Sequence, residues 1–277
     1  MWHFAEWVTC VTCVTWSAMC IAAEPEQPDA ASTLAKQRMD VMRQRAEALN
    51  IVGSEDEEIA CSKEPLLRYN DTPRGIVTAS LWALGAEGRP RAVLVLEVYG
   101  GTSMQYEFTC LSDPPKSAGT QGWRWAPRQA DFSWLRIDDA LSPHEAKKTR
   151  IRQLKQLSRE FSASEEWRGQ THQLRLMPQP IHQYEDDAKG VLDGAIFVLA
   201  HGTNVEILMT VEARQDKDGT RHWEAGFSRL ASASLNVTYR GKPFWSGPSS
   251  MSVGSSNAYY FRMAQLTPDE RSVFAEE

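Results

Sequence analysis

The sequence is short of the features by which an enzyme or a nucleic-acid-binding protein is usually recognised. Its 277 residues carry 30 Lys and Arg against 36 Asp and Glu, so the formal net charge is -6, which argues against bulk attraction to nucleic acid. It contains no G-x-S-x-G elbow, no H-E-x-x-H pair and no G-x-x-x-x-G-K-[ST] loop. We therefore predict no cofactor, no metal site and no specific nucleic-acid partner, and the sequence does not by itself identify a function.

Long apolar runs are also scarce outside the first 23 residues. Residues 1–23 contain no Lys or Arg, and Trp7 to Ala23 are apolar or small, which predicts a signal peptide. The run is too short and too rich in Thr, Ser and Cys for a membrane span of roughly 20 apolar residues. The chain is therefore predicted to be exported, periplasmic or extracellular, with no membrane span in the mature chain. The missing basic start leaves an uncleaved anchor as the alternative.

Cysteine is sparse in the rest of the chain. Three of the five cysteines lie in the leader, so only Cys61 and Cys110 remain once it is removed. An oxidising compartment would allow these two to form one disulfide. Alternatively, Cys110 shares a pleat face with Tyr106 and Phe108 and is a small buried apolar side chain. Both interpretations stay open at this point.

What the sequence does contain is a repeated pattern. Residues Pro65–Tyr99 align without a gap on Pro180–Arg214 at a shift of 115, with six identities in 35 positions. Apolar residues alternate in both copies, which predicts strands and leaves Glu97 and Glu212 on the face opposite the apolar side chains. This agreement predicts an internal duplication.

The order of the expected elements defines the fold class. Helices are predicted near Thr33–Asn50 and Pro143–Phe161. Strands are predicted at 76–84, 91–99 and 104–112, then at 172–177, 192–200, 205–214, 221–230, 235–245 and 258–266. We predict an α+β, mainly antiparallel β protein with two duplicated meander units, joined and covered by one or two helices. The predicted boundaries are 1–23 signal peptide, 24–62 linker and N-terminal helix, 63–140 first β-rich unit, 141–170 connecting helix, 171–248 second β-rich unit, and 249–277 tail with a possible strand.

The second helix carries two signals. Ser142, Pro143 and Glu145 have the spacing of a capping box with proline at the first helical position. Four basic side chains form one ridge on its outward side: Lys148, Arg152, Lys155 and Arg159. Such a ridge can attract anionic lipid, polysaccharide or nucleic acid. The alternative is a solvated face balanced by acids elsewhere.

Two sets of residues are candidate sites. If the two units are related by a pseudo-twofold axis, Glu97 and Glu212 could share one groove as acid and base. The alternative places both on a solvated strand face. Trp123 and Trp125 share a strand face and, with Trp134, could form an aromatic platform for sugar rings, although tryptophan more often packs in a core.

The chain also resembles a known group of sequences. The segments are LRLMPQPIHQYEDD, DGAIF, the HGT turn, ILMTVEAR, HWEAGFSRL, LWALGAEGRP and the Arg/Gln-rich helix before Phe161. Over most of residues 66–245 the chain is similar to a group of uncharacterised exported bacterial proteins. The resemblance includes no catalytic motif and implies no role for any residue.

Three functions fit these features. The first is an exported non-catalytic protein that binds a partner, an envelope component such as a polysaccharide, or another ligand. The second is an exported hydrolase that uses carboxylates at the interface of the two units. The third is a carbohydrate-binding module. The absence of an organised catalytic motif favours the first.

Overall fold

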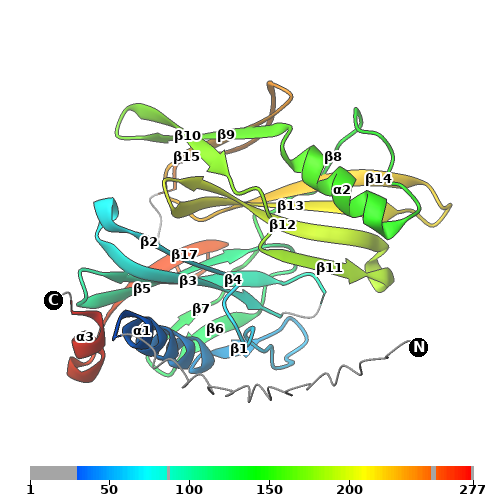
Figure 1. The fold of residues 1–277 in the computed structure, drawn as a ribbon. Helices are drawn as coiled ribbons and strands as arrows, with labels where there is room; N and C mark the ends of the chain where they lie inside the picture. The colour runs from blue at the N-terminus through cyan, green and yellow to red at the C-terminus, as the bar shows by residue number, and fades with distance from the viewer. Residues whose placement is uncertain (1–29, 86–87, 251–253, 276–277) are drawn as a thin grey trace, which may run out of the picture.

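Antiparallel β-structure dominates the chain, as predicted. The computed structural model describes residues 30–85, 88–250 and 254–275 (Figure 1). The helices are α1 (Ala30–Glu47), α2 (Lys147–Ser158) and α3 (Pro268–Phe274), with 3-10 turns η1 (Thr72–Arg74) and η2 (Asp187–Lys189). No helix of the described part is long and apolar enough to cross a membrane. The predicted leader, residues 1–23, lies outside the described residues.

Two large sheets are built on the same strand order. The first sheet runs β17 (Tyr259–Gln265), β5 (Ser103–Cys110), β4 (Ala92–Tyr99), β3 (Ile76–Leu84) and β2 (Leu67–Asp71). The second repeats four of these strands in the same order as β14 (Arg221–Arg229), β13 (Asn204–Gln215), β12 (Val191–His201) and β11 (His182–Asp186). At the edge that β17 occupies in the first sheet it has β8 (Leu135–Arg136), which precedes these strands in the chain. Beyond β12 it continues through β10 (Gln170–Leu176), β9 (Phe161–Trp167), β15 (Ser234–Tyr239) and β16 (Lys242–Gly247).

The pairing registers repeat at the predicted shift of 115. Tyr69 pairs with Ala79 in the first sheet, and Tyr184 pairs with Gly194 in the second. The register irregularity that follows Tyr69 also follows Tyr184, and 3-10 turns η1 and η2 occupy matching positions. The two four-stranded meanders therefore share topology, register and these irregularities, while the second has one further register shift, between Leu199 and Ala200.

The two sheets pack face to face between two outer layers. Leu81 and Val95 of the first sheet lie in one buried cluster with Ile196 and Leu208 of the second. The outer side of the first sheet is covered by α1, α3 and a small sheet of β1 (Asn50–Val52), β6 (Ser117–Thr120) and β7 (Trp123–Trp125), while α2 and the β9–β10–β15 region lie on the outer side of the second (Figure 1). Residues of odd number in β4, including Glu97, face the other sheet.

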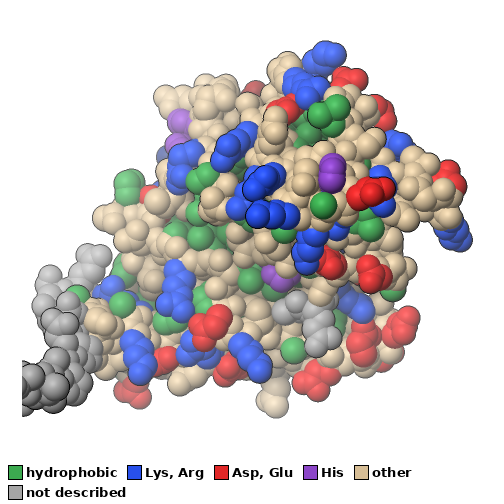
Figure 2. Space-filling model, turned by 45° about the vertical axis from the view of Figure 1, so that its right-hand side comes forward, with side chains coloured by type: hydrophobic (Ala, Val, Ile, Leu, Met, Phe, Trp, Pro, Cys, Tyr) green, Lys and Arg blue, Asp and Glu red, His purple; other side chains and the backbone are tan. Residues whose placement is uncertain are grey.

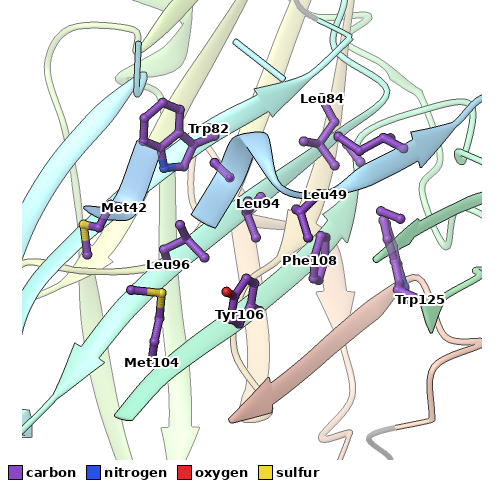
Figure 3. Close-up of a cluster of buried hydrophobic side chains, with 14 of the residues drawn as sticks. Met42, Leu49, Trp82, Leu84, Leu94, Leu96, Met104, Tyr106, Phe108 and Trp125 are labelled. Atoms are coloured by element: carbon purple, nitrogen blue, oxygen red, sulfur yellow. The ribbon is translucent and has the colours of Figure 1, made fainter. Parts of the chain in front are cut away.

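Helix α1 packs its apolar side chains against the outer face of the first sheet. Met39, Met42, Ala46 and Leu49 are all buried, as the periodicity predicts. Figure 3 shows Met42 and Leu49 of this segment among Trp82 and other large side chains of the sheet. Burial of these apolar side chains fixes the helix across the strands, since each contributes on the order of 1.5–3 kcal/mol.

The segment 141–170 differs from the predicted connecting helix. The helix occupies only Lys147–Ser158, and Phe161–Trp167 is strand β9. The Ser142 capping box does not form: Ala146 is the N-cap without a side-chain bond. Instead, the buried Arg150 guanidinium donates to the carbonyl groups of His144 and Glu145, which holds the chain before the helix. The strand forms because it pairs on both sides, with β10 and β15.

Close packing beneath one tyrosine supplies a first prediction. A Cβ atom at Gly194 would lie 2.4 Å from the ring of Tyr184, so the ring must move. We expect Gly194→Ala to lower the free energy of unfolding by about 1–3 kcal/mol, measured by urea titration. The control is Gly122→Ala, where nothing lies within 4 Å of the added atom. Equal stability of the two variants would contradict the packing described.

Candidate functional site

A cavity of about 620 Å³ opens at one end of the interface between the two sheets. Both units contribute to it: Glu97 and Glu107 come from β4 and β5, and Glu206 comes from β13. Glu165 of β9 completes a set of four carboxyl groups, each no more than 5% exposed. Four buried acids around one cavity are exceptional, because charged side chains are rarely fully buried unless they are paired.

Glu97 is held by three hydrogen-bond donors. The Tyr69 hydroxyl donates to Oε1 at 2.7 Å, and the Tyr99 hydroxyl donates to Oε2 at 2.7 Å. The Gln105 amide donates to Oε2 at 3.3 Å. Burial raises the pKa of Glu97, and the two tyrosine hydrogen bonds oppose that rise. The glutamate is therefore oriented by its neighbours. Among the described residues no basic side chain lies within ion-pair distance of it, and the charge of Arg74 lowers its pKa from further away.

Glu107 lies on the neighbouring strand and faces the same cavity. It accepts a hydrogen bond from the Tyr259 hydroxyl on β17. Burial and the nearby charges of Glu97 and Glu206 raise the pKa of Glu107 well above its ordinary value. Among the residues that the structure describes, neither Glu97 nor Glu107 forms an ion pair.

A second group of charges lies at the side of the cavity. Arg74 Nη1 donates to Glu206 Oε1 at 2.8 Å, and Arg74 Nη2 lies 3.6 Å from Glu165 Oε1. His201 Nδ1 lies 2.5 Å from Glu165 Oε1 and 2.8 Å from Arg74 Nη2. Burial raises the pKa of Glu206 to about 8, with a further rise from the Glu165 charge that Arg74 opposes. Glu206 is therefore largely protonated at neutral pH.

Glu165, His201 and Glu206 also meet the geometric requirement for a metal site. Their ligand atoms lie within 4.8 Å of one another, and carboxylate and imidazole are suitable ligands for several divalent metals. The sequence analysis predicted no metal site because it found no ligand motif, whereas these three residues come from separate strands, β9, β12 and β13. The guanidinium of Arg74 contacts all three side chains, so this cation neutralises the group, and a metal ion would have to displace it.

Glu97 and Glu212 do not share a groove. The Tyr69 hydroxyl that binds Glu97 is 3.4 Å from Asn204 at the start of β13. Glu212 is eight residues further along this strand, roughly 25 Å away at the strand rise. The predicted acid–base pair is therefore split between opposite ends of the interface. Neither residue is on a solvated face, since both are buried.

Glu212 is neutralised by arginine. Arg89 donates Nε and Nη2 to Oε1 and Oε2 of Glu212 at 2.7 and 2.9 Å, and Tyr184 donates to Oε1 at 2.5 Å. Arg214 Nη1 lies 3.5 Å from Oε2. A bidentate pair this deeply buried is structural, because both of its charges have partners and neither side chain lines the cavity described above.

The three candidate tryptophans do not form a common platform. Trp125 is fully buried, stacks on Phe108 and donates Nε1 to a backbone carbonyl. Trp123 packs beside it against the same core under Arg262. Trp134 lies instead 4.7 Å from the guanidinium of Arg89. Among the tryptophans that the structure describes, Trp167 presents an exposed ring, 40% exposed, at the cavity.

The predicted basic ridge lies on α2. Lys148, Arg152 and Arg159 are exposed and Lys155 is partly exposed. Figure 2 shows Lys and Arg side chains gathered on the upper part of the molecule, where α2 lies. In the described residues, Lys155 donates to the Gln179 side chain, and none of the four forms an ion pair. The ridge is solvated, and its charge is not balanced by local acids.

The two described cysteines are free thiols, so the possible Cys61–Cys110 disulfide is not formed. Cys110 is buried in the core of the first sheet, and Cys61 packs against that core. Burial therefore favours the alternative interpretation, in which Cys110 is a small apolar side chain.

Cys110 supplies the second prediction. Burial raises the pKa of its thiol to about 12, and only the thiolate is nucleophilic. We expect Cys110 to resist iodoacetamide at pH 8 in the folded protein and to react fully in 6–8 M urea, on the order of the denaturant needed for complete unfolding. Peptide mapping by mass spectrometry measures the labelling. Rapid labelling of the folded protein would contradict the burial.

Most of the acidic residues that line the cavity were not predicted from the sequence. Glu97 was found by its repeated position, but Glu107, Glu165 and Glu206 were not. One signal was present: AVLVLEVY is apolar on both pleat faces, which is typical of a strand buried on both sides. An acid within such a strand has to lie in the interior.

Comparisons with known proteins found no match for this chain. No family model matches the chain, no curated protein matches it, and no solved structure matches it. The resemblance to uncharacterised exported bacterial proteins therefore stays a prediction.

Proposed function

We propose that this chain is an exported binding protein whose ligand site is the cavity at the end of the sheet interface. The observation that carries the proposal is the set of four buried carboxyl groups, contributed by both units, around about 620 Å³ of open space. Ligand pockets of roughly 300–1,000 Å³ with a few convergent polar groups are the usual form of a small-molecule site. The exposed Trp167 ring at its edge supplies apolar contact area.

The packing of the site also supports binding. Tyr69, Tyr99 and Gln105 fix Glu97, so the carboxyl group is oriented before any ligand arrives. Pre-organised groups bind with a smaller entropy cost. The site lies between the two sheets, so neither unit alone would form it.

The test is a thermal-shift screen with a panel of small polar molecules, followed by calorimetry. Ser232→Trp places a large ring in the cavity lining and should abolish any shift. Ser162→Trp, on the exposed side of β9, is the matched control and should bind normally. A ligand that binds Ser232→Trp as well as wild type would place the site elsewhere.

A second candidate is a hydrolase with Glu97 as base and Glu206 as acid. Its support is the raised pKa of Glu206, about 8, opposite a carboxyl group held by three donors. A carboxyl group whose pKa is raised toward neutrality is suited to general acid catalysis, as in glycoside hydrolysis, and Glu97, whose pKa burial also raises, would act as the base. Turnover of a chromogenic glycoside and ester panel, lowered at least about 100-fold in Glu206→Gln, would favour it over pure binding.

Export and ancestry are parts of the same proposal. Residues 1–23 support export, and the matching registers of the two sheets support a duplication. Mass spectrometry of the secreted protein should find an N-terminus near Ala23 or Glu24. The basic ridge of α2 is the surface that suits an anionic envelope component such as a polysaccharide. A carbohydrate-binding module has no support from Trp123, Trp125 and Trp134, because these side chains do not form a common platform.

A further inference from the structure

The two units place the same tyrosine–glutamate pair in different surroundings. Tyr69 donates to Glu97, and at a shift of 115 Tyr184 donates to Glu212. Both glutamates face the opposite sheet and are buried. The molecule therefore contains two equivalent positions for a cation beside a buried carboxylate.

The position in the second unit is filled. Arg89, from the turn between β3 and β4, forms a bidentate pair with Glu212, and Arg214 lies beside it. The remaining space is closed by an aromatic ring, since a Cβ atom at Gly226 would lie 2.1 Å from Phe132. Here the protein supplies its own guanidinium.

The position in the first unit lacks that cation. At the same shift Arg89 corresponds to Asn204, and Arg214 corresponds to Tyr99. Asn204 lines the cavity, and its short side chain carries no charge. Glu97 is thus in contact with neutral donors and feels the charge of Arg74 only from a longer distance, where its counterpart has two arginines in ion-pair contact.

The neighbouring strand differs in the same sense. Val95 pairs with Glu107 in the first sheet, and its counterpart Thr210 pairs with Gly226 in the second. Glu107 therefore occupies the position of Gly226. Where the second unit has the ring of Phe132, the first has another buried carboxyl group and open space.

We propose that the ligand of this cavity carries a guanidinium or primary ammonium group, which takes beside Glu97 and Glu107 the place that Arg89 takes beside Glu212. The inference rests on the proposed binding function and specifies its ligand class. Glu97 and Glu107 are 2% and 5% exposed, line the cavity, and form no ion pair among the described residues. Buried carboxylates are normally paired with a cation. A guanidinium matches carboxylate geometry through its fork of N–H donors.

The probes are n-butylguanidinium, n-butylammonium, a capped Gly-Arg-Gly peptide and n-butylurea, the neutral isostere of the first. We expect n-butylguanidinium to bind at least about tenfold more tightly than n-butylurea in calorimetry at pH 8, since one buried charge pair exceeds a factor of ten. Glu97→Gln should remove this preference, because Glu97 is the counterpart of the Arg89-paired Glu212, while the exposed Glu166→Gln should keep it within about twofold. Tighter binding of the peptide than of n-butylguanidinium would identify an arginine side chain as the source of the cation. Tighter binding of n-butylguanidinium than of the peptide would identify a small free molecule as the source. Either result supports the proposal.

Asn204→Arg is the more specific test, because its side chain would place a guanidinium beside Glu97 as Arg89 places one beside Glu212. We expect this variant to fold, to lose binding of the cationic probes by at least about tenfold, and to melt at a higher temperature than wild type. A folded Asn204→Arg protein that binds n-butylguanidinium as wild type does would overturn the proposal. Equal binding of n-butylurea, or no binding of any probe at millimolar concentration, would overturn it as well.

Failure of this inference is distinguishable from failure of the proposed function. A neutral ligand that binds wild type and is lost in Ser232→Trp would preserve the binding function and exclude the cation. The absence of any cavity ligand, neutral or cationic, would remove both.

Discussion

Replacing Arg89 with alanine should destabilise this protein more than any surface charge substitution. The Arg89 side chain is 5% exposed and that of Glu212 is 0% exposed, so the variant removes the bidentate partner of a buried carboxylate and leaves it only the longer contact with Arg214, at 3.5 Å. Breaking a buried pair from one side costs about 3–5 kcal/mol. Urea unfolding monitored by tryptophan fluorescence should show a loss of this size in the free energy of unfolding.

Two further variants separate charge from packing. Arg68→Ala removes an exposed pair with Glu64, whose side chains are 56% and 65% exposed, and should cost less than about 1 kcal/mol. Arg89→Ala combined with Glu212→Gln removes the stranded charge and should recover part of the loss. A cost for Arg89→Ala as small as that for Arg68→Ala would show that Glu212 reaches water or a proton without this arginine.

The stability of the protein should fall as pH rises through the range in which the cavity acids lose protons. The pKa of Glu206 is about 8 in the folded chain and near the ordinary glutamate value of 4.5 when the chain is unfolded. Between these values the folded state binds more protons than the unfolded state, so the free energy of unfolding decreases with increasing pH. The contribution of protonated Glu206 is fully present below about pH 4.5 and is lost as pH passes 8.

Glu206→Gln isolates this effect because glutamine keeps an acceptor for Arg74 but has no proton to lose. We expect the stability of the variant relative to wild type to improve by on the order of 3 kcal/mol between pH 5 and pH 8.5. Urea titrations at several pH values measure it. The exposed Glu166→Gln variant should show no such trend. A pH-independent difference for Glu206→Gln would mean that its carboxyl group titrates normally.

The repeated strands were predictable because their signals are local. The apolar runs, rich in β-branched residues, in Ala92–Tyr99 and Asn204–Gln215 and the glycines between strands fix element type and length. The stripe of α1 was predictable for the same reason, since Met39, Met42 and Ala46 follow a helical period. The position predicted for helix α2 is correct, but the predicted helix is too long. At its start, the buried Arg150 binds the preceding chain in place of the expected Ser142 cap.

The site was harder to predict from the sequence than the strands were. Strand parity put Glu97 and Glu212 on one type of face, but whether that face met water or another sheet depends on packing between segments more than 100 residues apart. Phe161–Trp167 became a strand because β10 and β15 flank it, and partners distant in sequence leave little local trace. Its pairing brings Glu165 to the cavity.

By itself, then, the sequence determined an antiparallel β protein with two copies of one strand pattern, because pleat periodicity and turn residues act between near neighbours. Only the tertiary structure decided that the copies face each other and that one glutamate meets Arg89 while its counterpart meets open space. The physical reason is that a buried charge is governed by what surrounds it in three dimensions. Residues at positions 89 and 204 look unremarkable in the chain, yet their difference in length and charge closes one end of the interface and leaves the other open.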